Sequence, residues 1–241
     1  MTGQDTERRY ALYYAPAPTH PLSRAAAAWL GRDPFDPDRP PRTDRSAAEV
    51  QLTAEPRRYG FHATLKAPFR LAPGTSREEL EAAIQRFVQS RPPCPVGPLQ
   101  VTRLGRFFAL TPCKPAPFLQ GFAGQLVSEF DRFRAPMTPD DLQRRLEASL
   151  DEEQMTNLVR WGYPYVFDRF RFHMTLTGPV PAEDHEKVER RLKDRFEPLL
   201  DEDFHVDGIT LFEQARAGAN FVATSRLSFR QMQLEGTGNE R

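Results

Sequence analysis

One eight-residue pattern occurs twice in this chain, 111 residues apart, and it constrains the fold more than any other feature. Phe61 to Pro68 reads F-H-x-T-L-x-A-P, and Phe172 to Pro179 reads F-H-x-T-L-x-G-P. Each copy is followed by an amphipathic helical segment, at 76–91 and 182–200, and then by strand-like sequence. The duplication predicts two related halves, each built as strand, helix and hairpin.

The expected fold class is therefore α+β, as one bilobal domain that spans 1–241 with pseudo-two-fold symmetry. We expect lobe 1 around 50–115 and lobe 2 around 165–230. The segment at about 138–162 predicts two helices and has no counterpart before the first repeat, so we interpret it as an insertion.

Other elements are expected outside the repeats. The sequence predicts a short aromatic strand at 10–14, helices at 21–30 and 117–134, and an exposed loop at 33–45 that is rich in Pro, Asp and Arg.

Composition excludes several classes of protein. Lys+Arg and Asp+Glu are both 33, so the net charge is zero and gives no basic excess for long nucleic acids or anionic membranes. No apolar run approaches the ~18 residues of a membrane span, and the first residues do not read as a signal peptide. Cys94 and Cys113 alone make neither a disulfide framework nor a zinc site. These features predict a cytoplasmic protein without a membrane partner and leave its oligomeric state open.

The repeated segments carry residues suited to chemistry. Side chains alternate along a strand, so His62, Thr64 and Lys66 are expected on one face and the apolar residues between them on the other. In the second copy the same alternation groups the side chains of Arg171, His173 and Thr175. Two such faces that meet across a pseudo-dyad predict a cleft with two imidazoles, hydroxyls and cations.

That set of groups suits attack on a phosphodiester. The reaction needs a base for the attacking water and an acid for the leaving alkoxide, and two histidines can hold opposite protonation states near neutral pH. We therefore expect His62 and His173 to be catalytic. The phosphate oxygens are expected to bind the other four side chains of the two motifs, which are Thr64, Thr175, Lys66 and Arg171. No metal site and no cofactor are expected, because the two histidines lack an obvious third ligand.

Structural interpretations stand beside these. A single histidine on a strand often makes only structural hydrogen bonds, threonines favour strands on any polar face, and Lys66 and Arg171 also fit a solvated surface. The aromatic residues of Tyr13-Tyr14 and Tyr163-Pro164-Tyr165 have two interpretations: they line a pocket for a base or sugar, or they pack in the protein core.

With these two motifs the chain resembles the 2H phosphoesterase superfamily, named for His-x-Thr motifs in duplicated lobes. It is similar more narrowly to an uncharacterised bacterial branch encoded in phosphonate-utilisation operons. That similarity spans about 9–230 and is carried by four stretches: RYALYYAP (9–16), RRYGFHATLKAPF (57–69), FDRFRAP (130–136) and WGYPYV (161–166).

The resemblance implies a LigT-like bilobal fold with two antiparallel sheets facing a central groove. It also implies metal-independent hydrolysis or transfer at 2′,3′-cyclic or related phosphodiesters, with one of His62 and His173 as general base and the other as general acid. Thr64 and Thr175 would hold the phosphate oxygens, and the association with phosphonate breakdown suggests a ribose 1,2-cyclic phosphate. The gap between the motifs is longer than in compact members because of the insertion, which is expected to form a lid or rim that changes substrate choice.

The leading hypothesis is thus a cyclic phosphodiesterase that acts on a small-molecule cyclic phosphate. A non-catalytic module that binds a nucleotide or phosphate ester is the first alternative. An RNA-processing phosphoesterase or ligase is the second, and the zero net charge counts against it.

Overall fold

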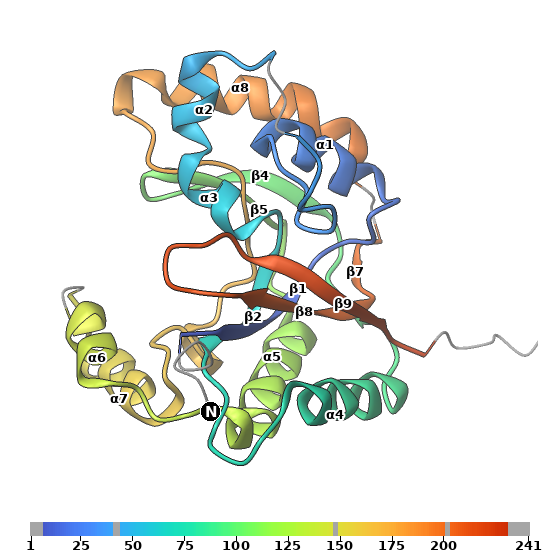
Figure 1. The fold of residues 1–241 in the computed structure, drawn as a ribbon. Coiled ribbons are helices and arrows are strands. Elements are labelled where there is room, and N and C mark those ends of the chain that lie inside the picture. Colours follow the sequence, from blue (N-terminus) through green and yellow to red (C-terminus); the bar gives the residue numbers. More distant parts are fainter. Residues whose placement is uncertain (1–6, 41–43, 147–148, 201–202, 231–241) are drawn as a thin grey trace, which may run out of the picture.

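One antiparallel sheet forms the centre of the molecule (Figure 1). The computed structural model describes residues 7–40, 44–146, 149–200 and 203–230. Within these ranges the strands of the sheet, in spatial order, are β4 (Leu99–Leu104), β5 (Phe107–Pro112), β6 (Met174–Thr175), β2 (Ala63–Phe69), β1 (Arg9–Tyr14), β8 (Gly208–Gln214) and β9 (Val222–Ser228). A separate short ladder joins β3 (Cys94–Pro95) to β7 (His205–Val206).

Helices cover both halves of this sheet. They are α1 (Pro21–Leu30), α2 (Ala47–Leu52), α3 (Ala54–Tyr59), α4 (Arg77–Gln89), α5 (Pro117–Glu129), α6 (Pro139–Leu146), α7 (Glu152–Trp161) and α8 (His185–Phe196). Short 3-10 turns occur at Asp131–Phe133, Phe167–Arg169, Ala182–Asp184 and Glu197–Leu199. None of the helices in the described ranges has the length and apolar character that crossing a bilayer requires.

The predicted α+β class with antiparallel strands is confirmed. α4 packs against β8 and β9, and α5 packs against β2, whereas α8 packs against β4 at the other end of the sheet and contacts α1. The core is rich in phenylalanine and leucine, and the apolar residues of both repeats lie in it: Phe61, Ala63, Leu65, Phe172, Met174 and Leu176.

The strand order divides each sequence repeat between two halves of the sheet. The hairpin β4–β5 follows β2 in the chain but pairs with β6, and the hairpin β8–β9 follows β6 but pairs with β1, the neighbour of β2. The hydrogen-bonded halves are therefore not the sequence ranges 50–115 and 165–230. Ala63 pairs with Met174 and so joins the two halves into one continuous strand order.

Local signals account for several helix ends. Ser76 and Glu79 form both bonds of a capping box at the start of α4, as the sequence predicts. Gly31 ends α1 in the left-handed region with φ 75°, a conformation that glycine adopts without steric cost. The helices α2 and α3 were not predicted, because each is only six residues long. The capping box of Ser46 and Glu49 was a readable signal for α2.

The predicted insertion folds as α6 and α7, which stand to one side of the sheet, at the lower left in Figure 1. Arg70 at the end of β2 pairs with Asp141 of α6. Arg134 donates a hydrogen bond of 2.8 Å to the carbonyl of Arg160 in α7. Each helix of the insertion is therefore tied to residues near the sheet rather than only to its chain neighbours.

Candidate active site

The pairing of β2 with β6 brings the two His-x-Thr motifs together. Ala63 is opposite Met174 in this antiparallel pair, and both side chains are fully buried in the core. The neighbouring positions therefore point to the other face, where His62 stands opposite Thr175 and the second histidine stands opposite the first threonine. Side chains opposite one another in such a pair have Cβ atoms about 5 Å apart. Each histidine thus lies beside the threonine of the other repeat.

Backbone carbonyl groups fix the orientation of both imidazoles. Nδ1 of His62 lies 2.9 Å from the oxygen of Gly60, and Nδ1 of His173 lies 2.8 Å from the oxygen of Arg171. A carbonyl oxygen only accepts hydrogen bonds, so Nδ1 carries the hydrogen in each ring. In the neutral imidazole, Nε2 is then the basic atom, and in His62 it lies 3.2 Å from Oγ1 of Thr64.

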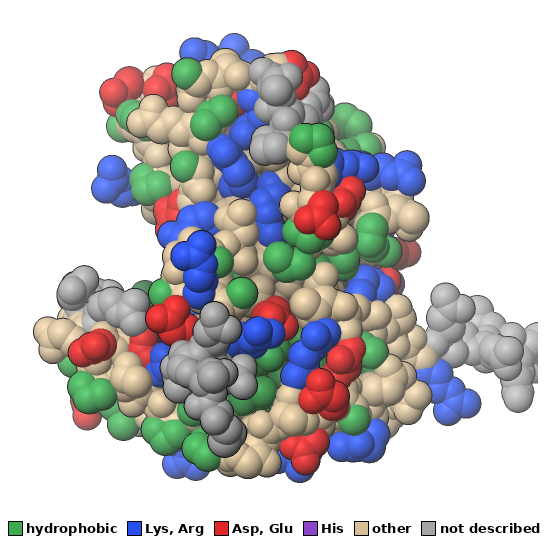
Figure 2. All heavy atoms as spheres, viewed as in Figure 1, with side chains coloured by type: hydrophobic (Ala, Val, Ile, Leu, Met, Phe, Trp, Pro, Cys, Tyr) green, Lys and Arg blue, Asp and Glu red, His purple; other side chains and the backbone are tan. Residues whose placement is uncertain are grey.

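Both motifs open into one cavity of about 540 Å³. Besides the two histidines and their threonines, its walls include Arg9, Tyr13, Glu55, Tyr59, Arg145 and Tyr163. We call this cavity the histidine cleft. It lies within the size range of sites for small organic ligands. In Figure 2 the molecule narrows between the part that carries α1, α2 and α8 and the part that carries α4 and α5, and Lys and Arg side chains gather over the narrow region.

The surroundings in the cleft disfavour the protonated form of both imidazoles. The pKa of His62 is lowered to about 4, chiefly by burial; the bond to Gly60 opposes this effect, and the charge of His173 adds to it. The ring of Tyr13 stacks on His62 with centroids 3.9 Å apart, and Tyr59 lies 6.0 Å away. Burial also lowers the pKa of His173. The repulsion between the two charged forms disfavours the state in which both rings are protonated.

Lys66 does not reach the cleft, so its predicted position on the face of His62 is wrong. A β-bulge in the pairing with β1 skips Leu65 between Thr64 and Lys66, and the bulge turns the lysine to the opposite face. Its ammonium group donates to Oδ1 of Asp131 at 3.1 Å and to the carbonyl of Val127 at 3.1 Å. Burial lowers the pKa of Lys66 to about 8, against the attraction of Asp131. This lysine links the sheet to the end of α5.

Arg171 contributes its carbonyl group rather than its side chain. The side chain is exposed and lines a different cavity, together with Phe170 and Phe172, so the structure does not bring this predicted cation to the histidines. The reason is that β6 begins only at Met174, so the strand alternation does not extend back to position 171. Thr177 lines the cleft, but its hydroxyl accepts a hydrogen bond of 2.9 Å from the backbone of Phe108.

Sequence reasoning missed the cations that do line the cleft, Arg9 and Arg145. Arg9 has the same strand parity as Tyr13 on β1, and that spacing was the available signal. Arg145 lies in the insertion, whose position relative to the motifs no local pattern reveals. In the described part of the chain, no three or more His, Cys, Asp or Glu side chains are grouped as a metal ion would require.

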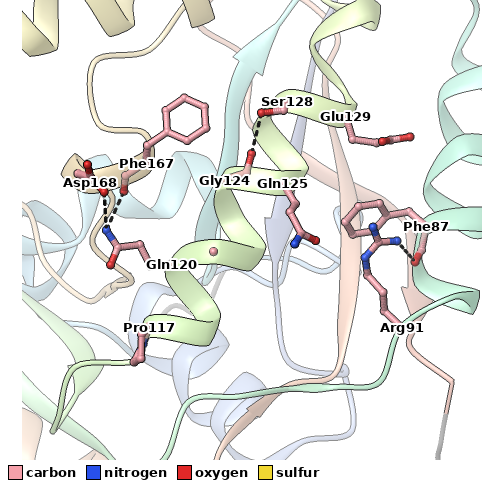
Figure 3. A pocket seen from close by; sticks show the side chains of 11 residues that line it. Phe87, Arg91, Pro117, Gln120, Gly124, Gln125, Ser128, Glu129, Phe167 and Asp168 are labelled. Atoms are coloured by element: carbon pink, nitrogen blue, oxygen red, sulfur yellow. Dashed lines mark hydrogen bonds between the residues drawn. The ribbon is translucent and has the colours of Figure 1, made fainter.

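A second cavity, of about 720 Å³, lies along α5 (Figure 3). Gln120 points from α5 to the carbonyl of Phe167 and donates to it at 3.2 Å, while Arg91 lies over the ring of Phe87 on the other side. Phe167 has a positive φ of 51°, which is uncommon for a bulky residue. The described residues that line this cavity include no histidine, so it offers no acid or base of the kind found in the cleft.

Comparisons with known proteins place this chain in a family and beside two curated relatives. The family described as "Protein of unknown function (DUF1045)" matches residues 64–222. A protein of Janthinobacterium sp. (strain Marseille) named "Ribose 1,5-bisphosphate phosphokinase PhnN" is 35% identical over 229 residues, which cover 92% of this chain and 51% of the relative. A protein of the same name from Laribacter hongkongensis (strain HLHK9) is 33% identical and matches 88% of this chain and 50% of its own length. The chain thus spans about half the length of these relatives.

Among solved structures, LigT of E. coli complexed with NADP+ matches with a TM-score of 0.41 and 16% sequence identity. That match covers 93% of this chain and 99% of the LigT chain.

Proposed function

This chain belongs to the DUF1045 family, and from the geometry of its histidine cleft we propose that it is a phosphoesterase that needs no metal ion. The observation that carries the proposal is the reciprocal arrangement of the two His-x-Thr motifs. His62 and His173 lie in one cavity, each held through Nδ1 by a carbonyl group and each accompanied by a threonine hydroxyl. This arrangement supplies an acid, a base and two hydrogen-bond donors to a phosphate group placed between them.

The proposed reaction is the hydrolysis of a phosphodiester. Nε2 of neutral His62 takes a proton from a water molecule, and the water oxygen bonds to phosphorus. The phosphorus bond to the leaving oxygen breaks, and that oxygen takes the proton from Nε2 of protonated His173. Thr64 and Thr175 donate hydrogen bonds to the non-bridging oxygens as their negative charge increases. Proton exchange with solvent then restores the starting forms.

The assignment of His62 as base follows from its surroundings. Because the ring is stacked on Tyr13 and its pKa lies near 4, His62 stays unprotonated across the physiological pH range. The pKa of His173 is lowered less than that of His62. The ring of Phe107 lies 6.0 Å from the ring of His173 and is tilted against it rather than stacked on it. It is therefore the ring that takes up a proton first.

The proposed substrate class is a cyclic phosphodiester of a phosphorylated ribose. Two observations support it: the cleft volume of about 540 Å³ suits a sugar phosphate, and the curated relatives bear a name that refers to ribose 1,5-bisphosphate. A ring-opened phosphate monoester would be the product. The sequence resemblance to proteins encoded in phosphonate-utilisation operons supports a role in phosphonate metabolism.

Phosphorus NMR tests this proposal. Purified protein in EDTA is incubated with 2′,3′-cyclic nucleotides and with 5-phosphoribosyl 1,2-cyclic phosphate, beside the variant His62→Ala. We expect the wild type to open a cyclic phosphate in EDTA and the variant to lose at least 100-fold in rate, the usual contribution of a general base. Saturable binding without ring opening would show that the protein is a binding module rather than an enzyme. Ring opening that survives in His62→Ala would overturn the two-histidine mechanism.

A further inference from the structure

Two arginines line the histidine cleft in addition to its two histidines. Arg9 from β1 and Arg145 from α6 both line its wall, and they come from elements more than a hundred residues apart in the chain. Neither belongs to a His-x-Thr motif. Two guanidinium groups that line one small cavity are a typical arrangement for binding a phosphate group.

A buried neutral partner holds Arg9 in position. Its Nε donates to Oε1 of Gln214 at 2.8 Å, and Gln214 is itself 1% exposed and donates to the carbonyl of Ala219 at 2.7 Å. The guanidinium also lies 5.8 Å from the ring centre of Phe221. An amide oxygen orients the cation without cancelling its charge, and no described carboxylate forms an ion pair with Arg9. The side chain is fixed in place and still carries a charge for a ligand.

Strand β1 sets Arg9 apart from the tyrosine that stacks on His62. Arg9 and Tyr13 share a face of β1, and Tyr13 stacks on His62. At ~3.3 Å per residue the two Cα positions lie about 13 Å apart, and the side chains span part of that distance. Ala67 and Pro68 line the cleft from the neighbouring strand β2. The side chains of these two residues are small and uncharged.

Arg145 supplies the second cation from the insertion. Its guanidinium lies 5.7 Å from the ring centre of Tyr163, which follows α7 and also lines the cleft. Burial raises the pKa of Tyr163 to about 12, so its hydroxyl stays neutral and can donate a hydrogen bond. The carboxylate among the lining residues is Glu55 on α3, which lies near Gly178 in the second motif.

We propose that Arg9 and Arg145 form a subsite for a second phosphate group of the substrate, a phosphate monoester on the sugar whose cyclic diester lies between the histidines. This inference rests on the proposed function for the reacting diester, but the subsite itself is a binding site. It makes a singly phosphorylated cyclic nucleotide a poorer substrate than a cyclic phosphate that bears another phosphate. The insertion then selects the substrate through Arg145, which agrees with its expected role as a rim.

Binding of an inert monoester tests the subsite without any turnover. Isothermal titration calorimetry compares ribose 5-phosphate with ribose on the wild type, Arg9→Gln, Arg145→Gln and the conservative Arg9→Lys. Arg103→Gln is the matched control, because Arg103 is exposed on the β4–β5 hairpin and is not among the residues that line the cleft. We expect binding that requires the phosphate group of the ligand. Each glutamine variant should lose at least tenfold in affinity, Arg9→Lys should lose less, and the control should lose none. Equal binding by wild type and both glutamine variants would overturn the subsite.

Kinetics separate this inference from the proposed function. If ribose 5-phosphate binds as expected but no cyclic phosphate is opened, the subsite stands and the phosphoesterase proposal fails. If the wild type opens cyclic phosphates with and without a second phosphate at the same KM, the phosphoesterase proposal stands and the subsite fails. We expect Arg9→Gln to raise KM for the doubly phosphorylated substrate at least tenfold, with little change for the other.

Discussion

At the scale of single residues, the two histidines have the same kind of backbone partner but different surroundings. Each donates a hydrogen bond from Nδ1 to a carbonyl oxygen, yet among the described residues only His62 has a tyrosine stacked on its face, with ring centroids 3.9 Å apart. Burial of His62 opposes its protonation, and from this asymmetry we propose the base role for His62 and the acid role for His173.

A substrate with an activated leaving group distinguishes the two roles. A p-nitrophenyl phosphodiester releases a stable phenolate and does not need an acid, whereas attack by water still needs a base. We therefore expect His173→Ala to retain most of the wild-type rate on this ester and to lose at least 100-fold on a ribose cyclic phosphate. His62→Ala is expected to lose activity on both. Absorbance of p-nitrophenolate measures the rates, and the reverse pattern would exchange the roles.

Folding stability should report the buried state of His62 directly. The pKa of this ring is about 4 in the folded chain and ~6.5 when exposed, so between these values the unfolded chain binds more protons than the folded one. Stability is therefore expected to fall as the pH falls from about 6.5 to 4. Urea unfolding across this window should give a shallower pH dependence for His62→Gln, which cannot titrate. Parallel curves for the two proteins would show that His62 is not buried as neutral imidazole.

Strand periodicity predicted at residue level which face lines the histidine cleft, up to the first irregularity. It placed His62 and Thr64 opposite the buried Phe61 and Ala63, as found. It failed at Lys66, because a bulge is decided by pairing with the neighbouring strand and leaves no mark on the alternation of one strand. A sequence pattern therefore supports a site residue only as far as regular pairing continues.

At the scale of elements, the turn between α3 and β2 sets the position of the first motif. Gly60 has φ 77° and ψ 176°, a conformation open in practice only to glycine, and a Cβ there would lie 2.7 Å from the ring of Pro34. Its carbonyl oxygen also holds Nδ1 of His62. One glycine thus joins loop packing to the orientation of the proposed base.

Gly60→Ala should damage both stability and catalysis. We expect a loss of about 1–3 kcal/mol from the strained backbone, with a further loss from the contact with Pro34. The movement of the carbonyl group should lower kcat because His62 is no longer oriented. Gly74→Ala is the matched control, since Gly74 also has a positive φ of 82° but a Cβ there meets nothing within 4 Å. Urea unfolding and initial rates measure the effects. Equal losses in the two variants would contradict a special role for this turn.

The sequence signals for helix ends were local, whereas the pairing of strands was not marked by any local signal. The capping box at Ser76 and Gly162 after Trp161 marked helix ends correctly because these bonds join neighbours in the chain. No sequence pattern near the hairpin at 99–112 indicated that it would pair with the second repeat. Periodicity sets which face of a strand is buried, whereas the choice of partner depends on packing across the whole sheet.

At the scale of the whole molecule, the exchange of hairpins makes each half depend on both repeats. The half that contains β6 is completed by β4 and β5 from the first repeat, and β1 and β2 are completed by β8 and β9 from the second. Trp29 of α1 adds a further link, since its indole nitrogen donates to the carbonyl of Leu176 at 2.8 Å. Neither repeat can bury its apolar faces alone.

The chain should therefore unfold in one transition despite its two-part appearance. Trp161→Phe leaves Trp29 as the sole tryptophan, and its fluorescence then reports the half that contains α1 and α8. We expect urea curves from this fluorescence and from far-ultraviolet circular dichroism to coincide, as a cooperative unit requires. Fragments 1–136 and 137–241 should each remain unfolded, because each lacks the strands that complete its sheet. Together they should recover structure, and separate transitions or an independently folded fragment would show that the repeats are separate units.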